Sequence, residues 1–355
     1  MASGPGRRHL RPPPTAHRRM PPPAPLLDGH GRAHTTLRIG LTERCNLRCV
    51  YCMPAAGVPV TPTAQMLTAD EVERLVRALA AAGVDRVRLT GGEPLARRDA
   101  VEIAARVGRV PGVRTLALTT NGLLLADRLA GLVEAGVTAV TVSLDTLRAD
   151  RFREVTRRPG LDRVLGAVEA ALGAGYAVGT GRPLKVNVVV LRGVNEDEAA
   201  DFAAWAAREP LEVRFIEWMP FGGNAWGRDQ FEPAADTRAR IEAVHGPLRA
   251  RDDGPHATAR TFTRPGWRGR VGFIASMSSP FCAGCTRLRV TADGALKVCL
   301  FGTREVGLRN ALRAGASEAD VRALVRGALA GKAAAHAGMD RLATLDNRPM
   351  ITIGG

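Results

Sequence analysis

Hydrophobic residues recur along the chain in two alternating patterns from residue 35 onward. Six short apolar runs rich in β-branched residues predict strands, at residues 37–41, 86–90, 115–119, 139–144, 184–191 and 212–218. Between them, apolar residues at helical spacing among strong helix formers predict helices, at residues 69–82, 100–109, 127–135, 161–175 and 197–208. This alternation predicts parallel strands joined by right-handed crossovers, in an open sheet or a closed barrel.

Polar and glycine-rich residues follow successive predicted strands. The segments 45–52, 91–94 and 120–122 come after the first three strands, and Asp145 comes after the fourth. Barrel enzymes place their sites at the carboxyl ends of their strands. We therefore expect an α/β fold built on a partial (β/α)6 TIM-like barrel.

The regular alternation ends near Gly222, so the expected barrel covers residues 35–222. Residues 223–355 are rich in proline, glycine and arginine and predict a smaller C-terminal domain. Residues 1–34 contain eight of the 23 prolines and six arginines against one aspartate, with no apolar period. We expect this first segment to be a disordered extension.

The chain has 355 residues, of which 45% are hydrophobic, so it can bury a sizeable core and is not disordered throughout. It contains no run of eighteen apolar residues and no secretory signal, which predicts a cytoplasmic protein without a membrane span. The net charge of +15 suggests a polyanionic partner. Only three of the 50 basic residues are lysine, however, and this arginine bias makes the charge a weak signal. We expect no nucleic-acid partner.

Six cysteines fall into two groups of three, which argues against three disulfides. Cys45, Cys49 and Cys52 form a C-x3-C-x2-C pattern directly after the first predicted strand. A structural zinc site needs a fourth ligand, and none lies nearby in the sequence. Three thiolates on a four-iron cluster would leave one iron open to a substrate or cofactor. The first triplet therefore favours an iron–sulfur cluster.

The second triplet consists of Cys282, Cys285 and Cys299, in a C-x2-C-x13-C pattern. Taken alone, this pattern is equally consistent with a zinc knuckle completed by His245 or His256.

The first triplet, with Tyr51 before its last cysteine and Gly91-Gly92-Glu93-Pro94 after the next strand, resembles the radical S-adenosylmethionine (SAM) superfamily. Phe281 to Arg289 resembles the C-terminal signature of the GTP 3′,8-cyclase family, whose members carry out the first step of molybdenum cofactor (molybdopterin) biosynthesis. The resemblance runs from about residue 35 to the end of the chain. It includes the segments 42–46, 52–54, 89–94, 119–122, 142–145, 185–187, 214–217, 281–289 and 354–355.

Two positions depart from the family pattern. Glu43 stands where the family more often has aspartate, and Gly302 stands where alanine is common. Neither position is an expected ligand.

The resemblance implies two [4Fe-4S] clusters and S-adenosyl-L-methionine as cofactors. The implied metal ligands are Cys45, Cys49 and Cys52 for the first cluster and Cys282, Cys285 and Cys299 for the second, in the C-terminal domain. The residues expected to line SAM are Tyr51, Gly92, Ser143 and Met219. The residues expected to contact GTP are Arg38, Arg88, Thr119, Lys185, Arg287, Leu288 and Arg289. Gly354 and Gly355 join the first cysteine triplet as expected catalytic residues.

The implied reaction converts GTP to (8S)-3′,8-cyclo-7,8-dihydroguanosine 5′-triphosphate. A deoxyadenosyl radical takes the ribose 3′ hydrogen, and the carbon radical then attacks C8 of guanine. Several cations must converge on the triphosphate, and arginine suits its oxygens. The implied partners besides GTP are a reductant such as flavodoxin or ferredoxin and a downstream cyclic pyranopterin monophosphate synthase. A homodimer formed through an exposed barrel helix is also expected.

Two alternatives remain at this point. One is a different radical SAM enzyme with an auxiliary cluster, such as a peptide-modifying maturase. The other is a zinc-dependent nucleic-acid-binding protein that uses the +15 charge.

Overall fold

One twelve-stranded sheet organises the chain in the computed structural model, which describes residues 24–354. Its central strands are parallel neighbours in sequence order, as the alternating pattern predicts. They are β1 (Thr36–Gly40), β2 (Arg86–Thr90), β3 (Thr115–Thr120), β4 (Ala139–Ser143), β5 (Leu184–Val190) and β6 (Glu212–Glu217). The predicted partial barrel is confirmed, and each predicted strand matches an observed one.

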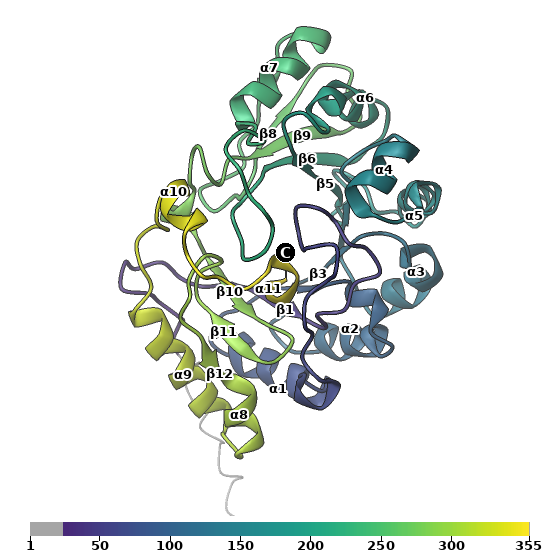
Figure 1. Ribbon diagram of the computed structural model, residues 1–355. Helices are drawn as coiled ribbons and strands as arrows, with labels where there is room; N and C mark the ends of the chain where they lie inside the picture. Colours follow the sequence, from purple (N-terminus) through teal and green to yellow (C-terminus); the bar gives the residue numbers. More distant parts are fainter. Residues whose placement is uncertain (1–23, 355) are drawn as a thin grey trace, which may run out of the picture.

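Helices cover the outer face of this curved sheet, while the last helix, α11 (Met350–Ile353), lies inside the curve (Figure 1). They are α1 (Ala69–Ala80), α2 (Ala100–Gly108), α3 (Leu125–Glu134), α4 (Ala149–Thr156), α5 (Leu161–Gly173) and α6 (Ala199–Arg208). The sequence pattern did not predict α4, because only Phe152 and Val155 among its larger apolar residues are buried.

Alternation along each strand separates the core from the barrel interior. In β1, Leu37 and Ile39 are fully buried in the main hydrophobic core, whereas Arg38 between them borders the interior cavity. The other barrel strands repeat this arrangement. The strand register therefore decides which polar side chains meet inside the barrel.

Residues after β6 extend both edges of the same sheet. On one edge, β9 (Arg270–Ile274) runs parallel to β6 and is followed outward by β8 (Arg260–Thr263) and β7 (Arg249–Ala250). On the other, β10 (Arg287–Val290) runs parallel to β1 and is followed by β11 (Ala295–Lys297) and β12 (Val306–Gly307). The sheet thus continues across residue 222. The division into two domains at this residue stays a prediction.

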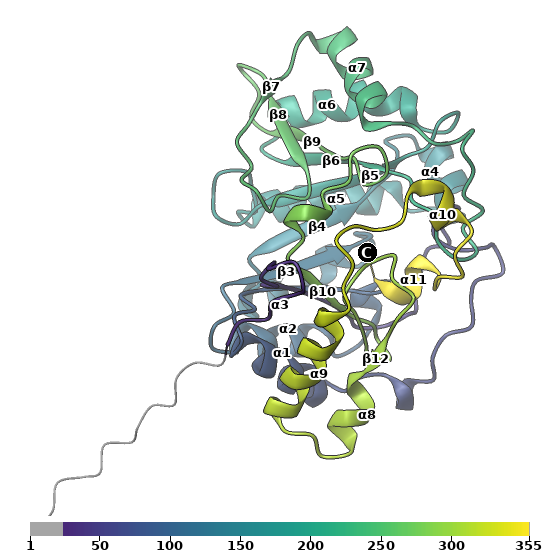
Figure 2. The same ribbon diagram turned by 90° about the vertical axis from the view of Figure 1, so that its left-hand side faces the viewer.

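The remaining helices are α7 (Ala234–His245), α8 (Leu308–Arg313), α9 (Glu318–Ala330), α10 (Met339–Ala343) and α11 (Met350–Ile353). The chain leaves α9, passes α10 and returns to the barrel as α11, as the yellow segment of Figure 2 shows. A second hydrophobic cluster, which includes Phe221, Phe301, Leu342 and Ile353, holds this return. No helix within residues 24–354 is long and apolar enough to cross a membrane.

The N-terminal expectation is wrong for part of its range. Residues 1–23 lie outside the described residues, but Leu26 and His34 are 0% and 1% exposed, and Leu27 pairs with Ala33 in a short antiparallel bridge. Leu26 belongs to the main core. One buried leucine does not form a periodic apolar pattern. The sequence therefore did not distinguish this segment from the proline- and arginine-rich residues around it.

Candidate functional site

One cavity inside the barrel is bordered by both cysteine triplets. The first triplet follows β1, and the second lies before β10 and after β11 on the adjoining edge of the sheet. All six cysteines of the chain are free thiols. Within residues 24–354, no three His, Cys, Asp or Glu side chains are arranged to hold a single metal ion. The six thiols thus form two sets of three soft ligands along one cavity, and neither set is arranged around a single ion.

The first triplet lies in a loop that three hydrogen bonds fix in place. Cys45 Sγ accepts hydrogen bonds from the Leu47 amide at 3.4 Å and from Asn121 Nδ2 at 3.7 Å. The Tyr51 hydroxyl donates to Asp145 Oδ2 at 2.7 Å, which ties the loop to the end of β4.

Burial favours the protonated form of Cys49 and Cys52 over the thiolate. It raises the pKa of Cys52 to about 12, helped by the negative charges of Cys45 and Asp145 and opposed by a hydrogen bond from the Ile351 backbone. Burial likewise raises the pKa of Cys49 well above its ordinary value. Bound iron supplies the positive charge that holds thiolates deprotonated in such a place. The donor set and its burial fit a thiolate-bound cluster.

The glycine turn after β2 packs directly on the cysteine loop. A Cβ at Gly92 would lie 2.5 Å from the Arg44 carbonyl oxygen, and Gly91 has a φ of +138°. Glu93 is fully buried and accepts hydrogen bonds from Thr120 Oγ1, the Asn121 amide and the Leu95 amide. Only glycine allows this close packing of the turn on the cysteine loop, and both glycines border the cavity beside the first triplet.

The second triplet has a positive surrounding. Lys332 Nζ lies 3.5 Å and Arg287 Nη2 lies 3.6 Å from Cys285 Sγ. Burial acts to raise the pKa of Cys285, but the charges of Arg287 and Lys332 outweigh it and lower the pKa to about 6. This thiol is prepared to serve as a thiolate ligand.

Three arginines lie side by side across β10, β1 and β2. The register pairs Arg38 with Arg289 on one side and with Arg88 on the other, and all three border the cavity. Burial, together with the charges of Arg289 and Arg88, lowers the pKa of Arg38 well below its ordinary value. Within residues 24–354, the buried Nε atoms of Arg38 and Arg289 have no hydrogen-bond partner. Buried, mutually repelling cations with unused donors fit a polyanionic ligand.

Most of the expected site residues border this cavity. Besides the six cysteines and the three arginines, they are Tyr51, Gly92, Thr119, Ser143, Met219 and Arg287. Arg88 is held by hydrogen bonds to Thr119 Oγ1 at 2.9 Å and Thr141 Oγ1 at 3.0 Å.

Three expected residues lie elsewhere, and a fourth, Gly355, lies outside the described residues. Lys185 borders a hollow at the amino ends of the strands, which shares Arg88 with the main cavity. Burial and the charge of Arg214 lower the pKa of Lys185 to about 7. Leu288 is fully buried in the hydrophobic core, so only its backbone faces the other strands. Gly354 is buried against the glycine turn. A Cβ atom added at Gly354 would lie 3.3 Å from the Gly91 nitrogen.

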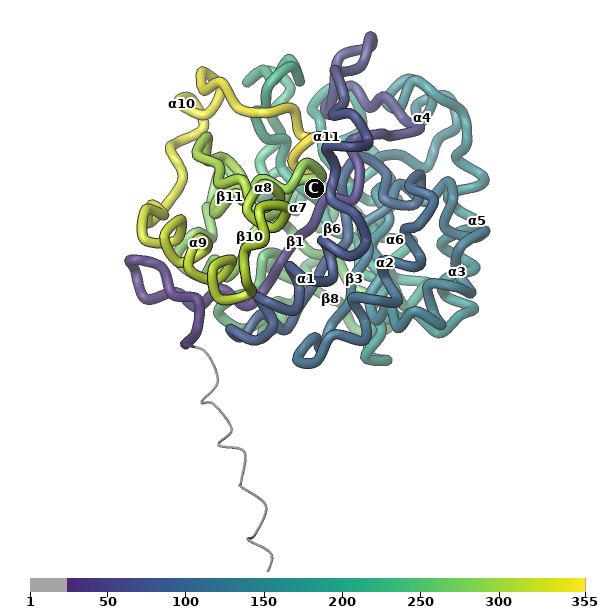
Figure 3. The backbone as a smooth tube through the Cα atoms, turned by 90° about the horizontal axis from the view of Figure 1, so that it is seen from below, coloured from purple at the N-terminus to yellow at the C-terminus, as the bar shows by residue number. Residues whose placement is uncertain are grey.

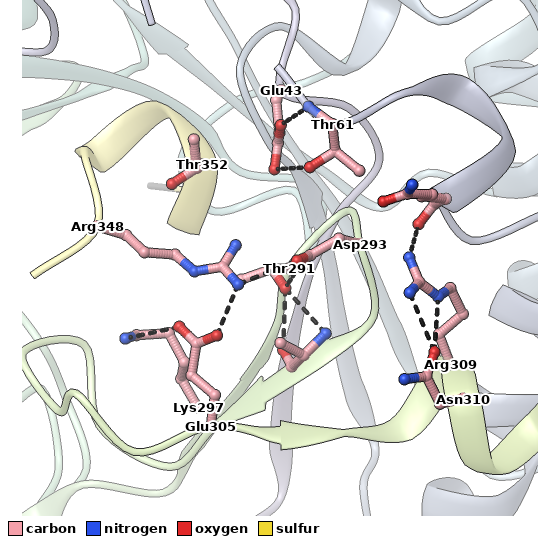
Figure 4. Close-up of polar contacts among 12 residues, drawn as sticks. Glu43, Thr61, Thr291, Asp293, Lys297, Glu305, Arg309, Asn310, Arg348 and Thr352 are labelled. Carbon is pink, nitrogen blue, oxygen red and sulfur yellow. Dashed lines mark hydrogen bonds and ion pairs between the residues drawn. The ribbon is translucent and has the colours of Figure 1, made fainter. Parts of the chain in front are cut away.

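The C-terminal segment is held over the cavity by an ion-pair network, which Figure 4 shows. Arg348 Nη2 lies 3.0 Å from Asp293 Oδ2 and 2.6 Å from Glu305 Oε2. Lys297 Nζ lies 3.3 Å from the same Glu305 carboxylate. Beyond Arg348, Met350 and Ile351 of α11 border the cavity. The same view includes Glu43, which stands where the family more often has aspartate. It accepts hydrogen bonds from Thr61 and does not contact this network.

Two interior residues were not among the expected site residues. Arg214 of β6 and Asn187 of β5 pair with each other in the register and both border the cavity. Asn187 Oδ1 is buried and has no hydrogen-bond partner within the described chain. Strand alternation carried the signal, because Asn187 lies two residues after Lys185 and must face the same side.

Comparison with known families gives two matches that together cover most of the chain. Residues 39–206 match the Radical SAM superfamily, and residues 211–338 match Molybdenum Cofactor Synthesis C. The crystal structure of Streptococcus suis SuiB bound to S-adenosylmethionine has a TM-score of 0.58 at 16% identity, over 79% of this chain and 65% of SuiB. That likeness shows the fold alone.

Several curated relatives are much closer in sequence. The mitochondrial GTP 3′,8-cyclase of Arabidopsis thaliana is 47% identical over 93% of this chain and 83% of its own length. The GTP 3′,8-cyclase of Pelotomaculum thermopropionicum is 45% identical over 93% of this chain and 100% of its own length. Molybdenum cofactor biosynthesis protein 1 of Mus musculus is 49% identical over 93% of this chain, which spans about half (51%) of the mouse protein. Full-length coverage at such identity, over a cavity bordered by two thiol triplets, means that the chain belongs to the GTP 3′,8-cyclase family of radical SAM enzymes.

Proposed function

We propose that this chain is a GTP 3′,8-cyclase, which converts GTP to (8S)-3′,8-cyclo-7,8-dihydroguanosine 5′-triphosphate in the first step of molybdenum cofactor biosynthesis. One observation supports this most directly: two sets of three thiols and a row of three arginines on neighbouring strands border a single cavity. The name of the full-length relative from Pelotomaculum gives the same substrate.

Cys45, Cys49 and Cys52 would hold a first [4Fe-4S] cluster, and Cys282, Cys285 and Cys299 would hold a second. When bound, the first cluster and SAM supply the radical that starts the reaction, and the second cluster supplies an open iron for guanine. Tyr51, Gly92, Ser143 and Met219 border the same cavity as the first triplet and would line SAM there. Gly92 lets this turn pack against the backbone of the cysteine loop, which keeps it at the cavity where the methionine end of SAM would lie.

GTP spans the distance between the two triplets in this proposal. Arg38, Arg88, Arg289 and the previously unassigned Arg214 would face its phosphates, because these strand cations border the cavity. Arg287 sits beside the second triplet, with its guanidinium 4.7 Å above the Phe281 ring. Met350 and Ile351 close the cavity from the C-terminal side, which excludes water from reactive groups.

We also propose that the enzyme acts in the cytoplasm with GTP as substrate and a flavodoxin-like or ferredoxin-like reductant. A cyclic pyranopterin monophosphate synthase would consume its product, and no nucleic acid is required. A homodimer stays a prediction.

Separate cysteine variants test the proposal. Anaerobic reconstitution should give about eight irons per wild-type chain, from two four-iron clusters, and GTP should be turned over with SAM and a reductant. Cys45→Ser should abolish SAM cleavage, whereas Cys282→Ser should retain some cleavage but lose GTP binding and product. Equal GTP affinity in wild type and Cys282→Ser would refute the role of the second site. Two zinc ions per chain without iron would favour the nucleic-acid-binding alternative, and two clusters without GTP turnover would favour a different radical SAM enzyme.

A further inference from the structure

Residues 26–34 form an N-terminal hook that closes on the second cysteine triplet and on the loop after α9. Figure 3 shows its purple trace beside α9. The Arg32 guanidinium fastens it, since Nη1 donates to the carbonyl oxygens of Cys282 at 2.8 Å and Ala334 at 2.7 Å. Arg32 Nε in turn donates to Asp28 Oδ2 at 2.6 Å. The hook therefore touches the backbone of an expected cluster ligand.

Lys332 lies at the centre of this contact and is only 6% exposed. Its Nζ lies 2.7 Å from His34 Nε2 and 3.5 Å from Cys285 Sγ. Within residues 24–354, no carboxylate forms an ion pair with this ammonium. A buried ammonium without a counter-charge is strongly destabilising. The thiolate of Cys285 is the anion that this lysine faces.

His34 fixes the direction in which the lysine donates. Its Nδ1 lies 3.0 Å from the Arg32 carbonyl oxygen, which can only accept, so Nδ1 carries the proton. Nε2 is then the acceptor for one ammonium hydrogen of Lys332. His30 Nε2 lies 3.2 Å from the Lys332 carbonyl oxygen, so the hook also holds the lysine backbone. A second ammonium hydrogen remains to point at Cys285 Sγ.

We propose that Lys332, aimed by His34 of the N-terminal hook, is a positioning residue that donates a hydrogen bond to the cluster ligand Cys285 and raises the reduction potential of the second cluster. This inference rests on the proposed function, because it needs a cluster at the second triplet. A thiolate-held cluster is negatively charged and gains one more negative charge on reduction. A cationic donor on its sulfur therefore stabilises the reduced form more than the oxidised form.

The test uses the full chain with Cys45→Ala, Cys49→Ala and Cys52→Ala, so that only the second site can assemble a cluster. After anaerobic reconstitution, iron content is measured and the midpoint potential is determined by a redox titration followed by electron paramagnetic resonance. Adding Lys332→Met should shift the midpoint to a more negative potential at unchanged iron content. Lys332→Arg keeps a charged donor, so its midpoint potential should lie close to that of the parent chain. His34→Ala should shift the midpoint in the same direction by a smaller amount, because Lys332 loses its guide.

Arg326→Met is the matched control. Arg326 also lies on the side of the hook, with Nη2 donating to the Ala24 carbonyl oxygen at 2.7 Å, but it contacts no thiol within residues 24–354. This control removes the same charge and should leave the midpoint unchanged. An equal shift in Arg326→Met and Lys332→Met would overturn the specific role of Lys332.

The remaining outcomes separate this inference from the proposed function. An unchanged midpoint in Lys332→Met, with normal iron content, overturns the inference and leaves the cyclase proposal intact. If Lys332→Met fails to fold, the His34→Ala midpoint decides, and no shift there overturns the inference. A parent chain that assembles no iron overturns the proposed second cluster, and the inference with it.

Discussion

Single interior residues decide the charge of the site, because each barrel strand turns every second side chain inward. Arg38 is the extreme case, since it lies between Arg289 and Arg88 in the register and its Nε has no partner within residues 24–354. Such a group costs folding free energy and is retained for what it binds.

Arg38→Met should therefore raise the stability of the ligand-free protein and weaken GTP binding. Replacing a buried, repelled cation by an apolar side chain is neutral or stabilising by up to about 4 kcal/mol, while loss of a phosphate contact should weaken GTP binding by about tenfold or more. Urea unfolding and equilibrium GTP binding check the two effects. Arg86→Met, on the exposed start of β2, is the control and should change neither. A destabilised Arg38→Met protein would contradict this interpretation.

Lys185 was expected to contact GTP but borders a separate hollow beside Arg88, so the pH dependence of GTP affinity tests whether its charge acts on the phosphates. Burial lowers its pKa to about 7, with a further contribution from Arg214, so the side chain is charged below that pH and neutral above it. GTP affinity should fall as the pH rises above about 7, by at most about tenfold per pH unit. Lys185→Arg stays charged, so its affinity should follow pH less steeply in the same titration. Identical pH profiles for the two proteins would remove Lys185 from the phosphate site.

At the scale of elements, the N-terminal hook behaves as part of the fold. Leu26 is fully buried in the main core, whereas its neighbour Leu27 is 48% exposed. Leu26→Ala should lower the free energy of unfolding by about 2 to 5 kcal/mol, and Leu27→Ala should change it by less than about 0.5 kcal/mol. Chemical denaturation of both variants makes the comparison. Equal, small effects would mean that the hook is not packed in solution.

The ion pairs of Arg348 should control the order of α11. Removing the guanidinium leaves Asp293 and Glu305 without their shared partner, which should cost about 1 to 2 kcal/mol locally. Hydrogen exchange of residues 350–354 in Arg348→Ala should then be about 5- to 30-fold faster. Arg228→Ala breaks an exposed ion pair with Asp340 of α10 and serves as the control. Unchanged exchange in Arg348→Ala would show that the hydrophobic cluster alone holds α11.

The elements that the sequence predicted are those with long periodic patterns. The six barrel strands and five of their helices are confirmed, because each has one face buried against its neighbours. The sequence pattern did not predict the hook or α4, because their few buried residues, such as Leu26 and Phe152, do not form a periodic apolar pattern. In the site, local motifs predicted the cysteines and Gly92, and the family resemblance predicted Arg38; all of them border the cavity. Arg214 and Lys332 were not assigned, because their neighbours are set by strand register and by a contact 298 residues apart.

At the scale of the whole molecule, cations gathered inside the barrel make its stability depend on anions. Inorganic triphosphate binds only the folded arrangement of these cations, so it should raise the thermal midpoint, with about 2.7 kcal/mol gained at 100 times its dissociation constant. Monophosphate at equal ionic strength should raise it much less, because it cannot reach several arginines at once. Differential scanning fluorimetry compares the two anions. Equal shifts would indicate a general salt effect.

The pairing of β1 with β10 also has a consequence for biogenesis. Leu37 pairs with Leu288, so these neighbours in the sheet are made about 250 residues apart. During synthesis, β1 and the cysteine loop that follows it leave the ribosome long before β10 exists. Closing the sheet at this edge is therefore a late, high-contact-order event. The two triplets therefore leave the ribosome in chain order, the first while this edge of the barrel is still unpaired.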